Sequence, residues 1–234
     1  MFHLYPDYLS EKGNWIRMLD LFEKYGHKVV IKPNEGTGGN GALLASSIPE
    51  LELHVHKTLK SRNTFCLCPY VEIQDEYRVI VLGGQTELIY KKAIPVITGD
   101  GKSTVLELLS GLYEEIPARI FTYLEEKGIS LHDVPVDQAA LKLNWKHNLG
   151  LGAGVWLDID PILKKRIETL ALAAAKEIGI QFASVDVVCD IQGNLSIIEI
   201  NSGVMLVNFS MHGNQEYRIA KGIYTKAIHL MMEE

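Results

Sequence analysis

The chain has 234 residues, of which 47% are hydrophobic, so it can bury a core in one large domain or two small ones. Its formal net charge of −6 argues against nucleic acid as a partner, because phosphate binding needs a basic face. With three cysteines, no apolar run long enough to cross a membrane and no signal-peptide pattern, we expect a cytoplasmic protein without a disulfide framework.

The first third of the chain predicts two helices and three strands. Apolar residues recur at helical spacing before Gly26, which is a typical C-cap. Pro49 suits the first turn of the second helix. The expected elements are a helix over 14–25, strands over 27–31 and 42–45, a helix over 49–62 and a strand over 64–71.

A glycine-rich loop over residues 34–41, Asn-Glu-Gly-Thr-Gly-Gly-Asn-Gly, joins the first two of these strands. It satisfies G-x-G-x-x-G literally, but a dinucleotide fingerprint requires a helix that opens directly from the loop, and residues 46–49 intervene. Its glycines let backbone N–H groups approach an anion closely. A lid over phosphates and a plain hairpin tip both remain open, and Lys32 on the preceding strand favours the lid.

From about residue 72 the pattern changes to a meander of antiparallel strands, expected over 76–82 and 86–97, which indicates a second sheet. Residues 99–104 are similar to a Walker A loop, but Val96 stands where its first glycine is needed, so we exclude that motif. Ser103 is expected to be the N-cap of a helix, and a further helix is expected over 115–127.

The stretch over residues 141–154 combines two lysines, a histidine and two asparagines with three glycines. Such a loop can bend hydrogen-bond donors around an anionic group, although a solvated loop fits equally well. Asp160 and Pro161 then predict the start of a long helix that ends near Ile178. A final amphipathic helix is expected over 216–231.

Residues 184–202 predict an antiparallel hairpin with strands over 185–189 and 195–200. Alternation places Glu199 and Asn201 on one face, and the turn brings Asp186 alongside them. Two carboxylates among apolar residues repel each other unless a cation lies between them. Oxygen ligands without His or Cys suit Mg²⁺ or Mn²⁺, which commonly bridges to nucleotide phosphates. The alternative is a set of polar strand ends in a solvated rim.

Taken together, these pieces resemble an ATP-grasp ligase over most of the chain. Val29-Val-Ile-Lys-Pro with its glycine loop resembles the phosphate-gripping hairpin of that family. The spacing of Asp186, Glu199 and Asn201 resembles the D…E-x-N magnesium triad of the family, which includes the D-alanine ligases.

A second set of motifs is similar in order to the C-terminal part of cyanophycin synthetase and the ligase half of bifunctional glutathione synthetases. It comprises Glu76-Tyr-Arg-Val, then Lys92, then residues 98–104, then Asn148-Leu-Gly-Leu-Gly. The resemblance implies an α+β fold in which two α/β subdomains with antiparallel sheets grip ATP between them. Residues 1–71 would form the subdomain with the phosphate lid, and residues 72–234 the subdomain with the magnesium and acceptor sites.

The implied reaction transfers the γ-phosphoryl group of ATP to a carboxylate, and an amine or thiol then attacks the acyl-phosphate. Its cofactors would be ATP and Mg²⁺ or Mn²⁺, and its substrates a small carboxylate and amine pair. By resemblance, the catalytic residues would be Arg78, Lys92 and Asn148. ATP would be bound by Lys32, Glu35, Gly36, Thr37, Gly38, Gly39, Gly41, Tyr70, Val71 and Glu76. The metal would be bound by Asp186, Glu199 and Asn201.

Each ATP-binding residue is assigned to one part of the nucleotide. Lys32 would contact phosphate, backbone groups of Tyr70 and Val71 would bind adenine, and Glu76 would bind the ribose hydroxyls. Arg78 and Lys92 would face the transferred phosphoryl group or the substrate carboxylate, and Asn148 the acyl-phosphate.

The sequence departs from the family in three places. Only 31 residues precede Lys32, so we expect the N-terminal substrate domain to be absent. Lys92 replaces an arginine of the subgroup and loses bidentate carboxylate recognition, and Ser202 stands where a proline follows Asn201. A carboxylate–amine ligase that uses its own dimer or a partner subunit, a non-catalytic nucleotide-binding module and a small-molecule kinase therefore all stay open.

Overall fold

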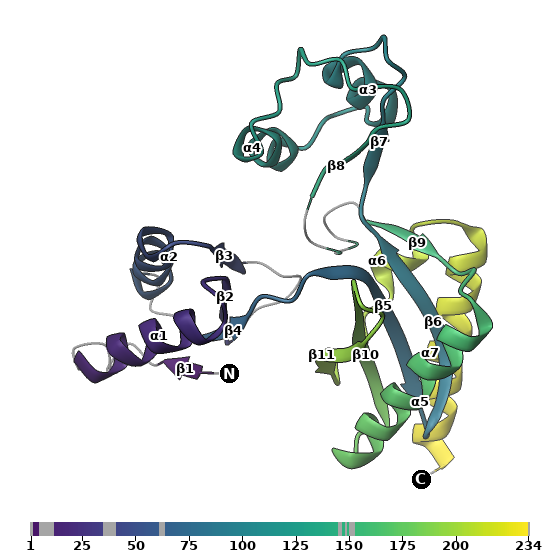
Figure 1. Ribbon diagram of the computed structural model, residues 1–234. Helices are drawn as coiled ribbons and strands as arrows, with labels where there is room; N and C mark the ends of the chain where they lie inside the picture. Colours follow the sequence, from purple (N-terminus) through teal and green to yellow (C-terminus); the bar gives the residue numbers. More distant parts are fainter. Residues whose placement is uncertain are drawn as a thin grey trace. The chain divides into compact units, whose positions relative to one another are not determined.

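The computed structural model describes residues 2–4, 12–34, 41–60, 64–144, 147, 149 and 153–233. The chain divides into two compact units, unit 1 (Met1–Glu72) and unit 2 (Ile73–Glu234), each built around its own antiparallel sheet (Figure 1). The expected division lay between residues 71 and 72. No helix among the described residues is long and apolar enough to cross a membrane.

Unit 1 is a four-stranded sheet with two helices packed on one of its faces. The strands lie in the order β1-β4-β2-β3, and Met18 and Phe22 of the first helix pack with Leu51 and Val55 of the second against Ile31. The hairpin and both helices predicted here are confirmed. The elements are β1 (Phe2–Leu4), α1 (Lys12–Lys24), β2 (Val29–Pro33), β3 (Leu43–Ala45), α2 (Ile48–Lys60) and β4 (Phe65–Pro69).

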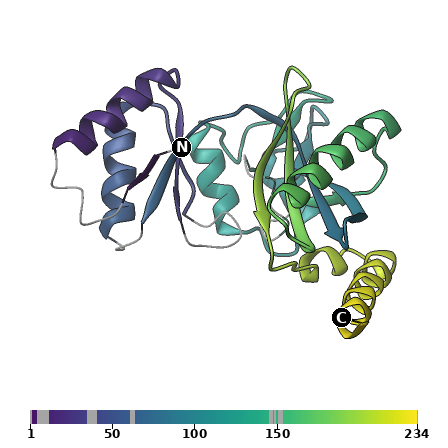
Figure 2. The same ribbon diagram turned by 90° about the horizontal axis from the view of Figure 1, so that it is seen from below.

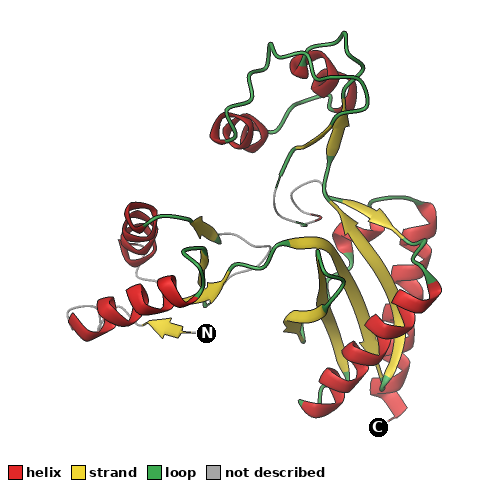
Figure 3. Cartoon of the chain, viewed as in Figure 1, coloured by secondary structure: helices red, strands yellow, loops and turns green. Residues whose placement is uncertain are grey.

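Unit 2 is built around a five-stranded sheet in the order β11-β10-β5-β6-β9, coloured yellow in Figure 3. The meander and the later hairpin predicted from the sequence are confirmed. The sheet strands are β5 (Ile73–Leu82), β6 (Gln85–Ala93), β9 (Gly154–Trp156), β10 (Phe182–Asp190) and β11 (Leu195–Asn201). The helices that cover them are α5 (Pro161–Glu177), α6 (Val207–Ser210) and α7 (Asn214–Glu233).

Alternation along the strands of unit 2 supplies two apolar faces. Val79 and Val81 of β5 pack with Ile167 of α5 on one side, whereas Ile80 packs with Phe209 of α6 on the other, together with residues of α7. Figure 2 shows α5 in green and α7 in yellow on the two sides of the blue strands. The sheet is therefore sandwiched, which buries β10 almost throughout.

A smaller layer with its own apolar core lies between β6 and β9 in the sequence. It comprises β7 (Val96–Thr98), α3 (Val105–Leu112), α4 (Ala118–Glu126) and β8 (Ala140–Lys142). The expected N-cap of α3 was wrong by one residue. The side chain of Thr104, not Ser103, caps the helix and forms a reciprocal capping box with Glu107. Ser103 instead donates its hydroxyl to Asp100.

Candidate active site

Four charged side chains from three adjacent strands meet on one face of the sheet of unit 2. Asp186 of β10 lies opposite Arg78 of β5, and Glu76 of β5 lies opposite Lys92 of β6. Residues that face each other across antiparallel strands project to the same side. Ile80 projects to the same side of the sheet and packs there against α6 and α7. The charged cluster therefore lies next to that apolar layer.

Asp186 is held by both cations of the cluster. Arg78 donates from Nε to Oδ1 and from Nη2 to Oδ2, both at 2.7 Å, which is the bidentate arrangement. Lys92 donates from Nζ to Oδ2 of Asp186 at 2.8 Å and also to the carboxylate of Glu76. Two cations and two carboxylates thus balance their charges in one connected network.

Three members of the network are buried, and Arg78 is partly exposed. The exposed fractions are 3% for Asp186, 4% for Lys92 and 8% for Glu76. Burial alone would raise the pKa of Asp186, but the hydrogen bonds from Arg78 and the charge of Lys92 outweigh it and hold that pKa below its usual range. Burial raises the pKa of Glu76, although Lys92 opposes the shift. Asp186 is therefore the stable anion at the centre of the cluster.

The edge strand β11 presents two further polar side chains to the side of Asp186, because its pairing with β10 shifts by one residue. Asp186 pairs with Glu199, but the next residue of β10, Val187, pairs with Ile197, so Ile198 is an extra residue on β11. Leu195, Ile197 and Ile200 accordingly pack on the α5 side. Glu199 and Asn201 face the side of Asp186, as the sequence predicted.

Asp186, Glu199 and Asn201 carry the oxygen ligands that a hard divalent cation prefers. An ionised carboxylate offers about four acceptor positions, and Arg78 and Lys92 occupy three on Asp186. Glu199 and Asn201 make no side-chain hydrogen bond or ion pair with any residue that the structure describes. No group of three or more His, Cys, Asp or Glu suited to a metal occurs in the described part of the chain, so such a site depends on the amide of Asn201.

The residues expected to bind ATP from unit 1 are described only in part. Lys32 lies on β2, opposite Cys66, while Glu35, Gly36, Thr37, Gly38 and Gly39 fall outside the described residues. Gly41 has a φ of +75°, and a Cβ there would lie 2.9 Å from Cγ of Pro33, so only glycine closes this hairpin without strain.

The backbone expected to bind adenine is already partly engaged. The Tyr70 N–H donates to the Lys28 carbonyl oxygen at 3.1 Å, and Lys28 also lies over the Tyr70 ring at 4.0 Å. The N–H of Tyr70 is therefore already engaged within unit 1, and the hydrogen bonds of this backbone to adenine stay a prediction. Val71 is exposed.

In the structure Lys92 pairs with Glu76 and Asp186, and Arg78 pairs with Asp186. The sequence had assigned Glu76, Arg78 and Lys92 to ribose and phosphoryl groups. Those ligand contacts stay predictions. Asn148 lies outside the described residues. His147 beside it is buried and donates from Nδ1 to the Lys92 carbonyl oxygen at 2.9 Å. His147 is thus tied to the strand that carries Lys92.

Tyr90 was missed by the sequence reasoning. It lies opposite Arg78 on β6 and two residues before Lys92, so strand alternation alone could have placed it on this face. Its ring contacts Phe209 at 4.9 Å between centroids. Burial raises the pKa of its hydroxyl to about 12, so Tyr90 remains neutral. Its buried ring belongs to the apolar layer that borders the charged cluster.

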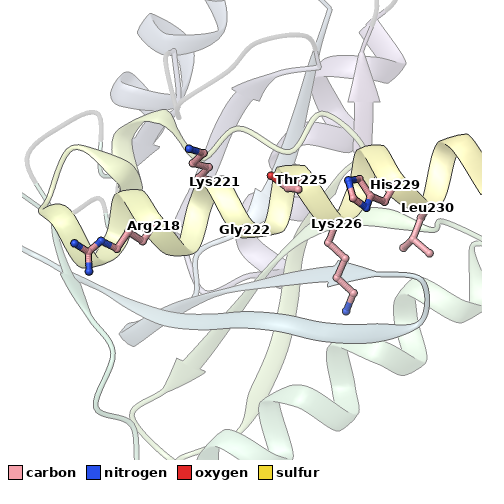
Figure 4. Close-up of a pocket in the computed structure, with 7 residues that line it drawn as sticks. All are labelled: Arg218, Lys221, Gly222, Thr225, Lys226, His229 and Leu230. Atoms are coloured by element: carbon pink, nitrogen blue, oxygen red, sulfur yellow. The ribbon is translucent and has the colours of Figure 1, made fainter.

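The pocket drawn in Figure 4 has a different composition. Its volume is about 620 Å³, and all its lining residues lie on α7, including Arg218, Lys221 and His229. Lys226, which also lines it, pairs with Glu87. None of the expected site residues lines this pocket, so the candidate site remains the face around Asp186.

The low pKa of Asp186 predicts how the stability of the protein depends on pH. A carboxylate with a depressed folded-state pKa stabilises fully above its unfolded value of about 3.9, and that contribution is lost as the pH falls through the folded value. We therefore expect the destabilisation caused by Asp186→Asn to shrink as the pH falls below about 4. Urea unfolding of both proteins between about pH 3 and 7 measures this difference, and a constant difference would contradict the assignment.

Comparison with known proteins gives the same kind of relatives in sequence and in structure. No protein-family model matches the chain. Cyanophycin synthetase of Trichormus variabilis is 24% identical, with 86% of this chain and 25% of the relative covered. The glutathione biosynthesis bifunctional protein GshAB of Enterococcus faecalis is 23% identical, with 86% and 29% covered. The chain spans about a quarter of the length of these curated relatives.

Among solved structures, the D-alanine–D-alanine ligase from Bacillus anthracis matches with a TM-score of 0.59 at 15% identity, covering 99% of this chain and 60% of that one. A bifunctional glutathione synthetase from Pasteurella multocida matches with a TM-score of 0.52 at 17% identity, covering 89% of this chain and 33% of that one. At these identities the likeness concerns the fold, and the motifs predicted from the sequence pointed to the same group of proteins.

Proposed function

We propose, from the premise that this chain has the α+β ATP-grasp fold, that it is an ATP- and Mg²⁺-dependent carboxylate–amine ligase acting through an acyl-phosphate. The observation that carries the proposal is the buried carboxylate of Asp186, held by Arg78 and Lys92 on the face that also presents Glu199 and Asn201. A metal-ligand set and two fixed cations are the parts that phosphoryl transfer requires.

Arg78 and Lys92 would act by position. Because Asp186 already fixes both side chains, their charges need little reorganisation when a phosphoryl group or an acyl-phosphate lies against them. The Lys92 ammonium pairs with both Glu76 and Asp186, and these two carboxylates hold it in place. The cluster would thus stabilise negative charge that develops on the transferred group.

Bound Mg²⁺ would neutralise phosphate charge during the transfer, and Asp186, Glu199 and Asn201 would hold it. Lys32 and the glycine loop of unit 1 would contact the phosphates, and the backbone at Tyr70 and Val71 the adenine. Glu76 would bind the ribose, and Asn148 the acyl-phosphate.

The coverage of the relatives supports a second candidate. The chain spans about a quarter of their length. In this second candidate it is a nucleotide-binding module, and a homodimer or a partner subunit supplies the rest of the substrate-binding site. Such a module would bind ATP without turnover on its own.

An ADP-release assay with a panel of amino acids and dipeptides tests these candidates, with mass spectrometry of the products. The ligase predicts ADP only when a carboxylate and an amine are both present, together with an amide product. A phosphorylated product without an amide would identify a kinase instead. Nucleotide binding by calorimetry without any ADP release would identify the module.

A further inference from the structure

A buried hydroxyl beside the charged cluster has no partner. The side chain of Tyr90 is completely buried, and its hydroxyl forms no hydrogen bond with any residue that the structure describes. Such a group loses its bonds to water and gains none in return, so it destabilises the folded protein. Native proteins contain few of them, and each calls for an explanation.

The position of this hydroxyl is fixed by packing and lies next to Arg78. The Tyr90 ring packs against Phe209 with 4.9 Å between the ring centroids, in the apolar layer that also contains Ile80. Tyr90 pairs with Arg78 across β5 and β6, so both side chains project to the same side of the sheet. Burial raises the pKa of the hydroxyl to about 12, and the charge of Arg78 acts in the opposite direction. The guanidinium therefore lies close to the hydroxyl without bonding to it.

Arg78 has donors to spare. A guanidinium carries five N–H donors, and Nε and Nη2 each use one of them on Asp186. Nη1 has no hydrogen-bond partner within the described part of the chain. The Arg78 side chain is also 22% exposed, so it is less tightly enclosed than the Tyr90 ring. A guanidinium that turns toward Tyr90 would find an oxygen whose acceptor positions are open.

The bonds from Arg78 occupy the positions of Asp186 that a metal ion would also use. The parallel bonds from Nε and Nη2 fill the inner lone pairs of Oδ1 and Oδ2, and Lys92 fills a further position on Oδ2. Carboxylates commonly hold divalent cations through the same inner positions. Asp186 therefore has to give up one bond from Arg78 when it serves as a metal ligand in this way.

We propose that Tyr90 is a positioning residue, whose hydroxyl accepts a hydrogen bond from Arg78 when Asp186 exchanges one of its bonds with Arg78 for the metal. The inference rests on the proposed function, because it assumes the metal site of Asp186, Glu199 and Asn201. Arg78 keeps its other bond to Asp186, so its charge stays within the cluster. The hydroxyl is unpaired in the resting protein and paired in the metal-bound protein, which favours metal binding.

Binding of Mn²⁺ by the full chain in the presence of ADP, with the free ion measured by electron paramagnetic resonance, tests this role. We expect Tyr90→Phe to weaken Mn²⁺ binding by about tenfold or more, which is typical for the loss of a hydrogen bond to a charged group. Tyr77→Phe is the matched control. Tyr77 is buried in the same sheet on the side of α5, and its hydroxyl donates to Asp75 at 3.3 Å, so its variant should leave Mn²⁺ binding unchanged.

Unfolding in urea without metal should order the same two variants the other way. Tyr90→Phe removes a hydroxyl that has no partner, so the midpoint of unfolding should stay the same or rise. Tyr77→Phe removes a bonded hydroxyl, so its midpoint should fall. A fall for Tyr90→Phe as large as that for Tyr77→Phe would show that the Tyr90 hydroxyl is already paired at rest, and would overturn the proposal.

Failure of this inference and failure of the proposed function give different results. If the unmodified chain binds no Mn²⁺ with ADP, the proposed metal site is wrong, and the role of Tyr90 is wrong with it. If the unmodified chain binds Mn²⁺ and Tyr90→Phe binds it equally well, the metal site stands and only the role of Tyr90 is wrong. Equal weakening in Tyr77→Phe would also refute that role, since the effect would then not be specific to the side of Arg78.

Discussion

The Asp186→Asn variant should lose ATP-dependent ADP release by about 10²–10³-fold, the range found when one preorganised electrostatic partner is removed from an active site. The substitution keeps the shape of the side chain but removes the charge that fixes Arg78 and Lys92. It also removes one carboxylate from the set proposed to hold the metal. A coupled assay of ADP release with the substrate pair found by the panel measures the effect.

Asp190→Asn is the matched control for this experiment. Asp190 ends the same strand, but its carboxylate accepts hydrogen bonds from Gln192 and Asn194 within the exposed turn. We expect its variant to keep ADP release within about threefold, because the turn lies outside the charged cluster. If Asp186→Asn also stays within that range while its circular dichroism is unchanged, the proposed site is wrong.

The Lys92→Met variant should lose about 3–5 kcal/mol of stability, the cost typical of removing one partner from a buried ion pair. Lys92 is 4% exposed and donates to both Glu76 and Asp186. Without it, two carboxylates remain buried side by side with Arg78 as their cation. The free energy of unfolding in urea measures the loss.

The neighbouring Lys91 provides a control of the same residue type. It pairs with Asp75, and both side chains are partly exposed, so Lys91→Met should cost only about 0–1 kcal/mol. The double variant Lys92→Met with Glu76→Gln should recover part of the loss, because one of the stranded carboxylates is then neutral. Equal costs for Lys91→Met and Lys92→Met would refute the network described above.

Local patterns were sufficient for much of the fold. The hairpin of β10 and β11 follows from its turn and its β-rich strands, and Asp160 caps α5 as its sequence predicts. The N-cap of α3 could have been assigned correctly, since Thr104, and not Ser103, has a glutamate three residues later. The strand expected over 86–97 is in fact two strands, β6 and β7, separated at Pro95, because proline cannot donate to a ladder.

The partners within the charged cluster could not be obtained in this way. Arg78 and Asp186 are 108 residues apart in the sequence, and Lys92 and Asp186 are 94 apart. They meet because β10 pairs with β5 on one side and β11 on the other, a matter of strand order that no local pattern encodes. The sequence therefore identified these residues but assigned them to ligands rather than to one another.

The extra residue Ile198 decides which face of the sheet the second half of β11 presents. If the strand ran without this bulge, so that Ile198 paired with Asp186, strict alternation would turn Glu199 and Asn201 toward the helix α5, with every side chain still present. The position of one bulge thus decides whether β11 offers its oxygen ligands to the site or hides them under α5, although no ligand residue changes.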